Sequence, residues 1–345
     1  MAQLVANRRV TLRHLATKLG FHLSTVSLAL RNSPKLPART CRKVQKLARR
    51  MGYRPDPMLT AISVYRKIEA SPRYQATIAW INNWPGRRDM LGNHTHREYC
   101  EGARERAEEC GYVLEDFWLL EPGLKTEKLG RVFKARNIQA LLFAPQPKAQ
   151  PLPAFRYDDF FAVAIGYTIQ PPVLNCVTNH HFHTMNLLLK HLQEMNYRRI
   201  GLCMDSVWDD KVENCWLGGM TLWHWKNPGL KVVPPFREQF SEVKAFQAWL
   251  RRDKPDVIIS HDRFAEALKN LDYRIPRDIG FASLDLNPEE KYLSGACQNS
   301  RLIGRKAVNF LIDMLHSGER GIPRFPSRLL VESEWRPGKT LRPQN

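Results

Sequence analysis

Residues 10–30 read VTLRHLATKLGFHLSTVSLAL, and this stretch decides the fold of the N-terminal part of the chain. Thr11 stands where a hydroxyl can cap a helix, and Gly20 suits the left-handed turn that ends one. Between them, apolar side chains recur at helical spacing, at Leu12, Leu15, Ala16 and Leu19. A second apolar stripe follows at Val26, Ala29 and Leu30. Two helices joined by a glycine turn within about 20 residues predict a helix-turn-helix.

A third amphipathic stretch covers 37–51, with apolar residues on one face and Lys/Arg on the other. The first 75 residues hold 16 Lys/Arg against only Asp56 and Glu69, whereas the rest of the chain holds 37 against 32. A basic head on a nearly balanced body favours binding to a polyanion, because such binding releases condensed counterions.

The chain has 345 residues, of which 43% are apolar and 25% charged, so it is long enough for two or three domains with real cores. No uncharged apolar run reaches the ~18–20 residues of a membrane span, and the N-terminus lacks the apolar region of a secretory signal. Seven scattered cysteines without a C-x-x-C pair are typical of reduced cytosolic thiols. We therefore expect a cytoplasmic protein.

After residue 75, short apolar runs alternate with amphipathic stretches. The expected strands cover 76–81, 113–119, 140–144, 160–166, 199–203, 257–260 and 280–284. The expected helices cover 97–110, 124–136, 182–195, 212–225, 243–251, 263–271 and 300–315. This alternation predicts parallel sheets in two lobes, with a ligand cleft at the carboxyl ends of the strands.

The head resembles that of the lactose-repressor (LacI/GalR) family of bacterial transcription regulators, through residues 10–30, RNSP at 31–34 and GYRPDP at 52–57. The body resembles the family's core more loosely, at 101–107, 191–201, 259–262, 276–280 and 298–307. The resemblance implies an all-α helix-turn-helix DNA-binding head joined to an α/β periplasmic-binding-protein-like core of two lobes with parallel sheets. The implied domains are the head at 1–56, a hinge helix and linker at 57–72, and an effector-binding and dimerisation core at 73–345. Lobe one would cover about 75–175 and 299–322, and lobe two about 176–298 and 323–345.

The resemblance also implies a recognition helix at 23–31, whose leading residues Leu23 and Ser24 face base edges in the major groove. Hydroxyl and amide side chains would contact phosphates, at Thr25, Ser27, Asn32, Thr40 and Tyr53. Thr11 and Arg31, near the two ends of the motif, complete the expected DNA-contacting set of the head.

Leu28 stands where the family usually has an Arg. An Arg there can donate two hydrogen bonds to a guanine, and a Leu cannot, so the target half-site should differ from the usual one. Leu28 would contact a thymine methyl group instead. The alternative is that Leu28 packs locally and contacts no base.

Within the expected hinge helix at 57–65, the resemblance places Ile62, with Leu59 beside it, at the dyad of the operator. There the side chain would insert into the minor groove and kink the DNA. The alternative is an ordinary linker helix whose two apolar side chains pack against a neighbouring element.

For the effector, the resemblance implies contacts from His261, Asp285 and Gln298, with Asp262 adjacent. Asp285 would accept hydrogen bonds from ligand hydroxyls, which suits a sugar. The alternative is that its carboxylate caps a loop or pairs with a group across the hinge. Three tryptophans suggest an aromatic pocket, although each can equally belong to a core. Trp216 replaces a family Arg, and the other two follow expected strand ends, at Trp84 and Trp118.

Histidines at 180, 181 and 183, and a pair at 94 and 96, raise the hypothesis of a metal site. Neighbouring histidines at a helix start cannot all face one ion, and no Cys or carboxylate spacing completes a site, so we expect no metal and no cofactor. The P-loop, G-x-S-x-G and H-E-x-x-H motifs are absent from the sequence, which argues against an enzyme.

The sequence therefore predicts a sequence-specific bacterial transcription regulator in the nucleoid, not at a membrane. It would bind a near-palindromic double-stranded operator as a homodimer, under control of a small ligand, a carbohydrate, held between the lobes. Two alternatives stay open: a solute-binding module with a largely non-specific DNA-binding head, and a sugar-processing enzyme fused to such a head. Equal affinity for all duplexes would favour the first alternative, and turnover of a sugar the second.

Overall fold

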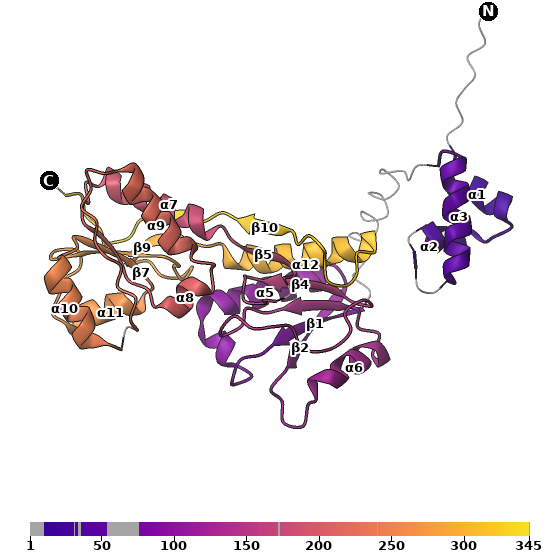
Figure 1. The fold of residues 1–345 in the computed structure, drawn as a ribbon, viewed down its shortest axis with the longest axis horizontal. Helices are drawn as coiled ribbons and strands as arrows, with labels where there is room; N and C mark the ends of the chain where they lie inside the picture. The colour runs from indigo at the N-terminus through magenta and orange to yellow at the C-terminus, as the bar shows by residue number, and fades with distance from the viewer. Residues whose placement is uncertain are drawn as a thin grey trace, which may run out of the picture. The chain divides into compact units, whose positions relative to one another are not determined.

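The computed structural model describes residues 10–30, 32–33, 36–53, 76–171, 173–239 and 241–344. They form a helical head (residues 10–53) and a larger α/β core (residues 76–344), each visible in Figure 1. Arg31 and the expected hinge helix at 57–65, with Leu59 and Ile62, lie outside the described residues. None of the described helices is long and apolar enough to cross a membrane.

The head contains three helices, α1 (Leu12–Leu19), α2 (Leu23–Leu30) and α3 (Ala38–Arg50). Thr11 caps α1, since its Oγ1 accepts from the His14 amide at 3.4 Å while His14 Nδ1 accepts from the Thr11 amide at 3.1 Å. Gly20, with a φ of 67°, makes the left-handed turn toward α2. The inward faces share one core of Leu15, Ala16, Val26, Ala29, Cys41, Val44, Leu47 and Ala48. The predicted helix-turn-helix is confirmed.

Lobe one of the core is built on a six-stranded sheet in the order β10-β5-β4-β3-β1-β2, with every pair parallel. Its strands are β1 (Ala76–Asn82), β2 (Tyr112–Trp118), β3 (Ala140–Phe143), β4 (Phe161–Ile165), β5 (Asn175–Asn179) and β10 (Arg328–Val331). The helices of this half are α5 (His94–Glu109), α6 (Leu129–Ala135) and α12 (Ser300–Ser317), with short 3-10 turns at η1 (Asp89–Gly92) and η2 (Thr126–Lys128).

Lobe two has a five-stranded sheet in the order β11-β9-β8-β7-β6, parallel except for β11. Its strands are β6 (Ile200–Leu202), β7 (Val257–Ser260), β8 (Gly280–Ser283), β9 (Ser294–Cys297) and β11 (Glu334–Arg336). Alternation along β7 puts Val257 and Ile259 in one apolar cluster and Ile258 in the other. The first cluster packs under α7 (His181–Glu194) and α9 (Cys215–Lys226), and the second under α10 (Val243–Asp253) and α11 (Arg263–Asn270).

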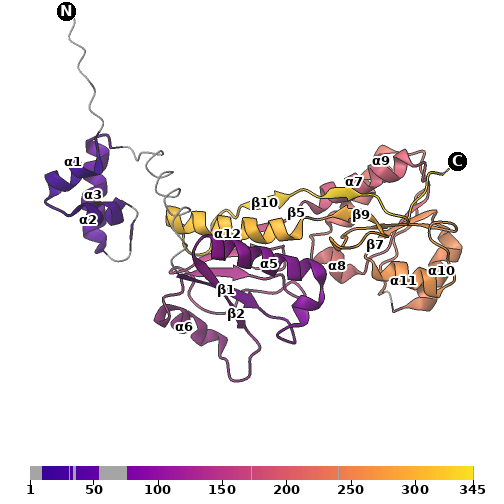
Figure 2. The same ribbon diagram turned by 180° about the vertical axis from the view of Figure 1, so that it is seen from behind.

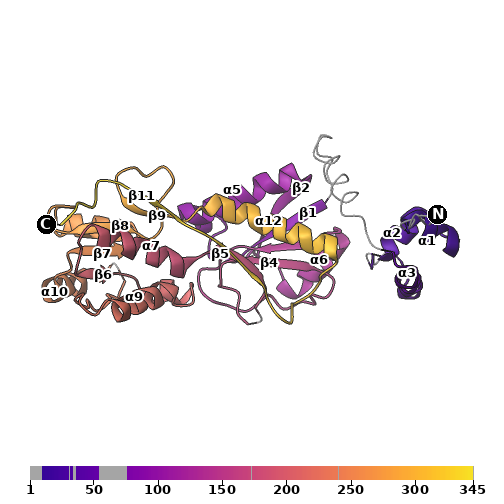
Figure 3. The same cartoon turned by 90° about the horizontal axis from the view of Figure 1, so that it is seen from above.

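The chain passes between the two lobes after β5, after β9 and after β10, as Figure 3 shows. We call these three connections the crossovers: β5 to α7, β9 to α12 and β10 to β11. The helix that follows the second crossover, α12, lies beside α5 (Figure 2). A Cβ on Gly102 of α5 or Gly304 of α12 would collide with the facing backbone, so glycine is needed at both positions for this close approach.

The expected fold class is confirmed, and each of the seven expected strands is present within one or two residues of its predicted range. The sequence missed β5, β9, β10 and β11, which are short and carry no long apolar run; β5, for example, reads NCVTN. Two of these correct the expected lobe boundaries, because β5 and β10 were assigned mainly to lobe two and instead extend the sheet of lobe one.

Candidate functional site

The surface of the head is basic. Residues 10–53 contain no Asp or Glu. Eight of their Lys/Arg side chains are exposed in the structure, at Arg13, Lys18, Arg39, Arg42, Lys43, Lys46, Arg49 and Arg50. A compact unit with this charge attracts a nucleic-acid backbone irrespective of its sequence.

The helix expected to enter the major groove, α2, has a buried side and an exposed beginning. Val26 and Ala29 are fully buried, whereas Leu23 is 40% exposed and Ser24 is exposed. The Ser24 hydroxyl lies 2.8 Å from Nδ1 of His22, which fixes its position at the start of the helix. Thr25, Ser27 and Leu28 are half-buried. The leading residues of α2 are thus the ones most available to a base edge.

Hydrogen bonds within the head hold the other residues that are expected to contact DNA. Asn32 adopts a φ of 52°, and its Oδ1 accepts from Gln45 Nε2 at 2.7 Å. The backbone amide of Thr40 donates to Pro37 at 2.9 Å at the start of α3. The amide of Tyr53 donates to Ala48 at 2.9 Å, and its ring packs against the head core. Their contacts with phosphates stay a prediction.

A cavity of about 450 Å³ lies in the core. Small-molecule sites typically have volumes of roughly 300–1,000 Å³. Its walls are largely the residues that follow parallel strands of both sheets: Tyr167 and Thr168 after β4, Asp205 after β6, His261 and Asp262 after β7, Asp285 after β8 and Gln298 after β9. The carboxyl ends of strands are where open α/β sheets bind ligands.

Two further segments close the cavity. The first turn of α5 contributes His94, Thr95 and His96. The segment that contains α8 (Ser206–Asp210) and the start of α9 contributes Trp208, Lys211 and Trp216. The cavity therefore combines carboxylates, imidazoles, an ammonium group and indole rings.

Asp285 is a carboxylate of the cavity wall that contacts two side chains of α5. Its Oδ2 accepts a hydrogen bond from the Thr95 hydroxyl and lies 3.5 Å from Nε2 of His94. Burial by itself raises the pKa of Asp285, but His94 and Thr95 outweigh it and hold that pKa below its ordinary value. For His94 burial lowers the pKa, and the nearby Asp285 more than compensates, so its pKa is raised. Among the described residues both contacts are made by Oδ2, which leaves Oδ1 to accept from a ligand.

Asp262 is linked to the backbone of Asp285 through Ser283. The Ser283 hydroxyl donates to Asp262 Oδ1 at 2.5 Å and accepts from the backbone amide of Asp285 at 3.2 Å. Burial raises the pKa of Asp262, although the Ser283 hydroxyl partly offsets that effect. The side chain of Gln298 is also held in place, because its Nε2 donates to the Leu284 carbonyl at 3.0 Å.

Besides His94, whose Nε2 faces Asp285, three histidines of the wall have a buried ring nitrogen without a hydrogen-bond partner among the described residues: Nδ1 of His96, Nδ1 of His181 and Nε2 of His261. Burial lowers the pKa of His261, and it lowers the pKa values of His96 and His181 to about 3. All three rings are therefore neutral at pH 7. Buried polar atoms normally have partners, so these nitrogens are candidates for contact with a ligand.

Lys211, which lines the cavity, lies close to the rings of two tryptophans. Lys211 Nζ lies 4.5 Å from the ring centroid of Trp208 and 5.5 Å from that of Trp84. Burial lowers the pKa of Lys211 to about 8, with Asp205 opposing the shift. Trp84 itself does not line the cavity; its Nε1 donates to the Pro145 carbonyl at 2.8 Å, and its ring contacts His96 at 5.3 Å.

The structure thus brings five of the seven expected effector residues to one cavity: Trp216, His261, Asp262, Asp285 and Gln298. Trp84 and Trp118 do not line this cavity, and a contact of either with the effector stays a prediction. The Trp118 indole donates to the Trp84 carbonyl at 2.8 Å, and Trp84 in turn supports His96 and Lys211.

Sequence reasoning missed several wall residues. Asp205 lies two residues beyond an expected strand, so the rule that ligands bind at strand ends could have identified it. His94 and His96 were considered only as a metal pair, and the expected helix began after them at residue 97. Lys211 carried no local signal, because its place depends on how the α8–α9 segment folds over the cavity.

We expect acid to destabilise the core through His96. Its pKa is lowered to about 3, so below about pH 6.5 the unfolded chain binds a proton that the folded chain excludes, and stability falls as pH falls. Between pH 7 and pH 5 this one group should cost about 2 kcal/mol. Urea unfolding at both pH values should show that loss reduced in His96→Asn and retained in His316→Asn, a substitution at an exposed histidine. An equal loss in both variants would contradict the assignment.

No family model matches this sequence, and no curated protein is significantly similar to it. The fold, in contrast, matches solved structures. The transcriptional regulator CelR in complex with cellobiose has a TM-score of 0.55 at 17% identity, over 96% of this chain and 100% of that chain. The lac repressor dimer bound to operator and the anti-inducer ONPF has a TM-score of 0.56 at 16% identity, over 96% and 99%.

A LacI-family transcriptional regulator from Silicibacter pomeroyi has a TM-score of 0.53 at 21% identity, over 96% of this chain and 99% of that chain. In all three cases the match covers the head as well as the core, since the core by itself is too short to reach that coverage. The chain therefore has the complete fold of LacI-type transcription regulators, a helix-turn-helix head followed by a periplasmic-binding-protein-like core.

Proposed function

We propose that this protein is a transcription regulator that binds a specific DNA operator and changes its DNA affinity when a small polar ligand, a sugar, occupies the core cavity. The observation that carries the proposal is the combination of features in one chain. A helix-turn-helix head without acidic residues precedes a core whose cavity lies at the carboxyl ends of strands from two parallel sheets. Proteins with the same fold are solved with an operator and with cellobiose.

The chemistry of the cavity favours a ligand rich in hydroxyl groups. Asp285 Oδ1 can accept from a hydroxyl, and the neutral rings of His181 and His261 offer nitrogens that donate or accept according to tautomer. Trp208 presents an indole next to Lys211, which suits the apolar face of a sugar ring. A purely apolar ligand would leave these polar groups without partners.

On the DNA side we propose a homodimer on a near-palindromic operator, with two heads that contact two half-sites. Leu23 and Ser24 would contact base edges, and the hydroxyl and amide residues of the head would contact phosphates. The expected hinge helix at 57–65, which lies outside the described residues, would insert Ile62 at the dyad. Ligand affinity would differ between an open and a closed arrangement of the lobes, and this difference would set the coupling to DNA.

Selection of bound duplexes from a random pool tests this function. The full-length protein is incubated with the pool near physiological salt, with and without a set of mono- and disaccharides. Enrichment of a palindrome, altered by one of the sugars, is the expected result. Binding to all duplexes alike, fading only as salt rises, would overturn the proposal in favour of a non-specific head.

Leu28→Arg should change the preferred half-site. The new guanidinium can donate two hydrogen bonds to a guanine, which discriminates by about 1–3 kcal/mol, or roughly 5–150-fold at one base pair. The same selection with Leu28→Met, which has similar volume and no donor, should return the wild-type site. An unchanged site in Leu28→Arg would show that position 28 does not reach the bases.

A further inference from the structure

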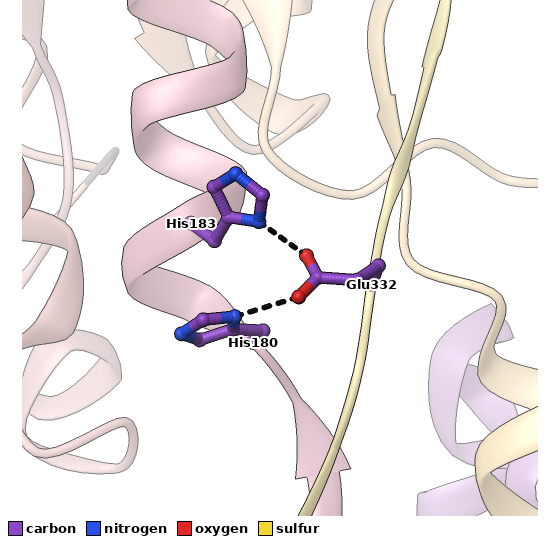
Figure 4. A group of neighbouring side chains, drawn as sticks. All are labelled: His180, His183 and Glu332. Carbon is purple, nitrogen blue, oxygen red and sulfur yellow. Dashed lines mark hydrogen bonds and ion pairs between the residues drawn. The ribbon is translucent and has the colours of Figure 1, made fainter.

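Two histidines and a glutamate meet where the chain passes between the lobes, outside the ligand cavity. His180 follows β5, His183 lies in the first turn of α7, and Glu332 follows β10. Nδ1 of His180 lies 2.9 Å from Oε1 of Glu332, and Nδ1 of His183 lies 2.5 Å from Oε2 (Figure 4). The rings come from one segment and the carboxylate from another that is about 150 residues away in sequence.

We propose that His180, His183 and Glu332 form a binding site for a divalent transition-metal ion of the Zn²⁺ class. Their three donor atoms lie within 4.8 Å of one another. Two imidazoles and one carboxylate are a donor set that Zn²⁺ uses in three-residue sites, with water in the fourth position. Ca²⁺ and Mg²⁺ fit this donor set less well, because both ions prefer oxygen atoms at every coordination position.

The backbone around the three residues is held in place by other hydrogen bonds. The His180 amide donates to the Val331 carbonyl at 2.9 Å, which continues the ladder between β5 and β10. Asn179 Nδ2 donates to Ser333 Oγ at 2.8 Å, and Asn299 Nδ2 donates to the Glu332 carbonyl at 2.9 Å. The ligand positions are therefore fixed before an ion arrives, and only side-chain rotations are needed to place the ion between them.

Exposure provides both access and the remaining ligands. The side chains of His183 and Glu332 are 57% and 59% exposed, so water can complete the coordination sphere. His181, between the two ligands in sequence, is buried and belongs to the wall of the cavity. The three near-adjacent histidines thus do not share one ion. The missing ligand is Glu332, which no local spacing in the sequence reveals.

The site joins all three crossovers. His180 belongs to the first and Glu332 to the third, and Asn299, which holds Glu332, belongs to the second. A bound ion would tie α7 to the β10–β11 connection and so restrain the movement of one lobe against the other. Because such coupling is reciprocal, the ion would alter any ligand affinity that depends on lobe closure.

Calorimetric titration of the untagged full-length protein with Zn²⁺ alone tests the site. We expect one ion per chain, with binding weakened at least about tenfold in Glu332→Gln and in His183→Gln, since even second-shell losses cost 10–100-fold. Glu334→Gln and His316→Gln are matched controls at an exposed glutamate and an exposed histidine, and both should bind as the wild type does. Equal unfolding temperatures without metal would show that all four variants are folded.

Three results would overturn the proposal. These are no saturable binding by the wild type, equal binding by Glu332→Gln, and a loss in His183→Gln that Glu332→Gln does not share. The last of these would describe a pair of histidines without the carboxylate. The test does not involve DNA or the cavity ligand, so its outcome is independent of the proposed function.

Discussion

Asp285→Asn should shift the response of DNA binding to much higher ligand concentrations while leaving the affinity for the operator without ligand unchanged. The substitution keeps the size of the side chain but removes the charge that accepts from a ligand and pairs with His94. Hydrogen bonds to charged groups contribute about 1.5–3 kcal/mol, so we expect ligand affinity to fall roughly 10–150-fold. Operator affinity measured across a titration of the sugar that alters duplex selection provides the measurement.

Asp278→Asn is the matched control for this prediction. Asp278 is an aspartate of the same lobe, paired with Arg274 at 2.8 Å at the surface and absent from the cavity wall. Its loss should leave both ligand affinity and DNA binding as in the wild type. An unshifted ligand response in Asp285→Asn, in protein that unfolds at the usual temperature, would show that the ligand binds elsewhere.

Gly304→Ala should destabilise the core by about 3 kcal/mol, near the upper end of the usual cost of overpacking. A Cβ at this position would collide with the backbone carbonyl of Tyr99 on α5 and with the amide of Ala103. Neither atom can rotate away, so the two helices must separate. The same separation displaces the first turn of α5, which carries Thr95 against Asp285, and ligand affinity should therefore fall as well. Urea unfolding at pH 7 measures the first effect.

The control for this substitution is another helical glycine. Gly218 lies in α9, and a Cβ there would meet nothing within 4 Å. Gly218→Ala should be neutral or should stabilise the protein by up to about 1 kcal/mol, because alanine favours the helix. Equal effects at the two positions would mean that the crossing of α5 and α12 does not require a glycine.

The sequence predicted best those helices and strands whose determining residues lie close together in the chain. The head was predicted nearly in full, because its caps, its glycine turn and its apolar stripes all lie within residues 11–51. In the core, the apolar strands were predicted where burial on both faces leaves a continuous apolar run, as in Val257–Ser260. The strands that were missed are short and carry no long apolar run, and one of them, β10, pairs with a strand that lies about 150 residues away in sequence, β5.

The candidate site divides in the same way. Asp285 and His261 were predicted from a resemblance carried by the residues around them, and they line the cavity. Trp84 and Trp118 were expected at the ligand because they follow strands, but a strand end does not fix the direction of a side chain. Lys211 and Asp205 were missed although they lie on the wall.

The sequence by itself determined the basic helix-turn-helix head, the two-lobed α/β class of the core and most of the strands whose ends form the cavity. These features depend on hydrophobic periodicity, capping and charge, which act between near neighbours in the chain. Only the tertiary structure decided which side chains face the cavity, how close α5 comes to α12, and that Glu332 meets His180 and His183. The physical reason is that the three crossovers bring together segments about 150 residues apart, and side-chain direction there is set by packing that no local pattern encodes.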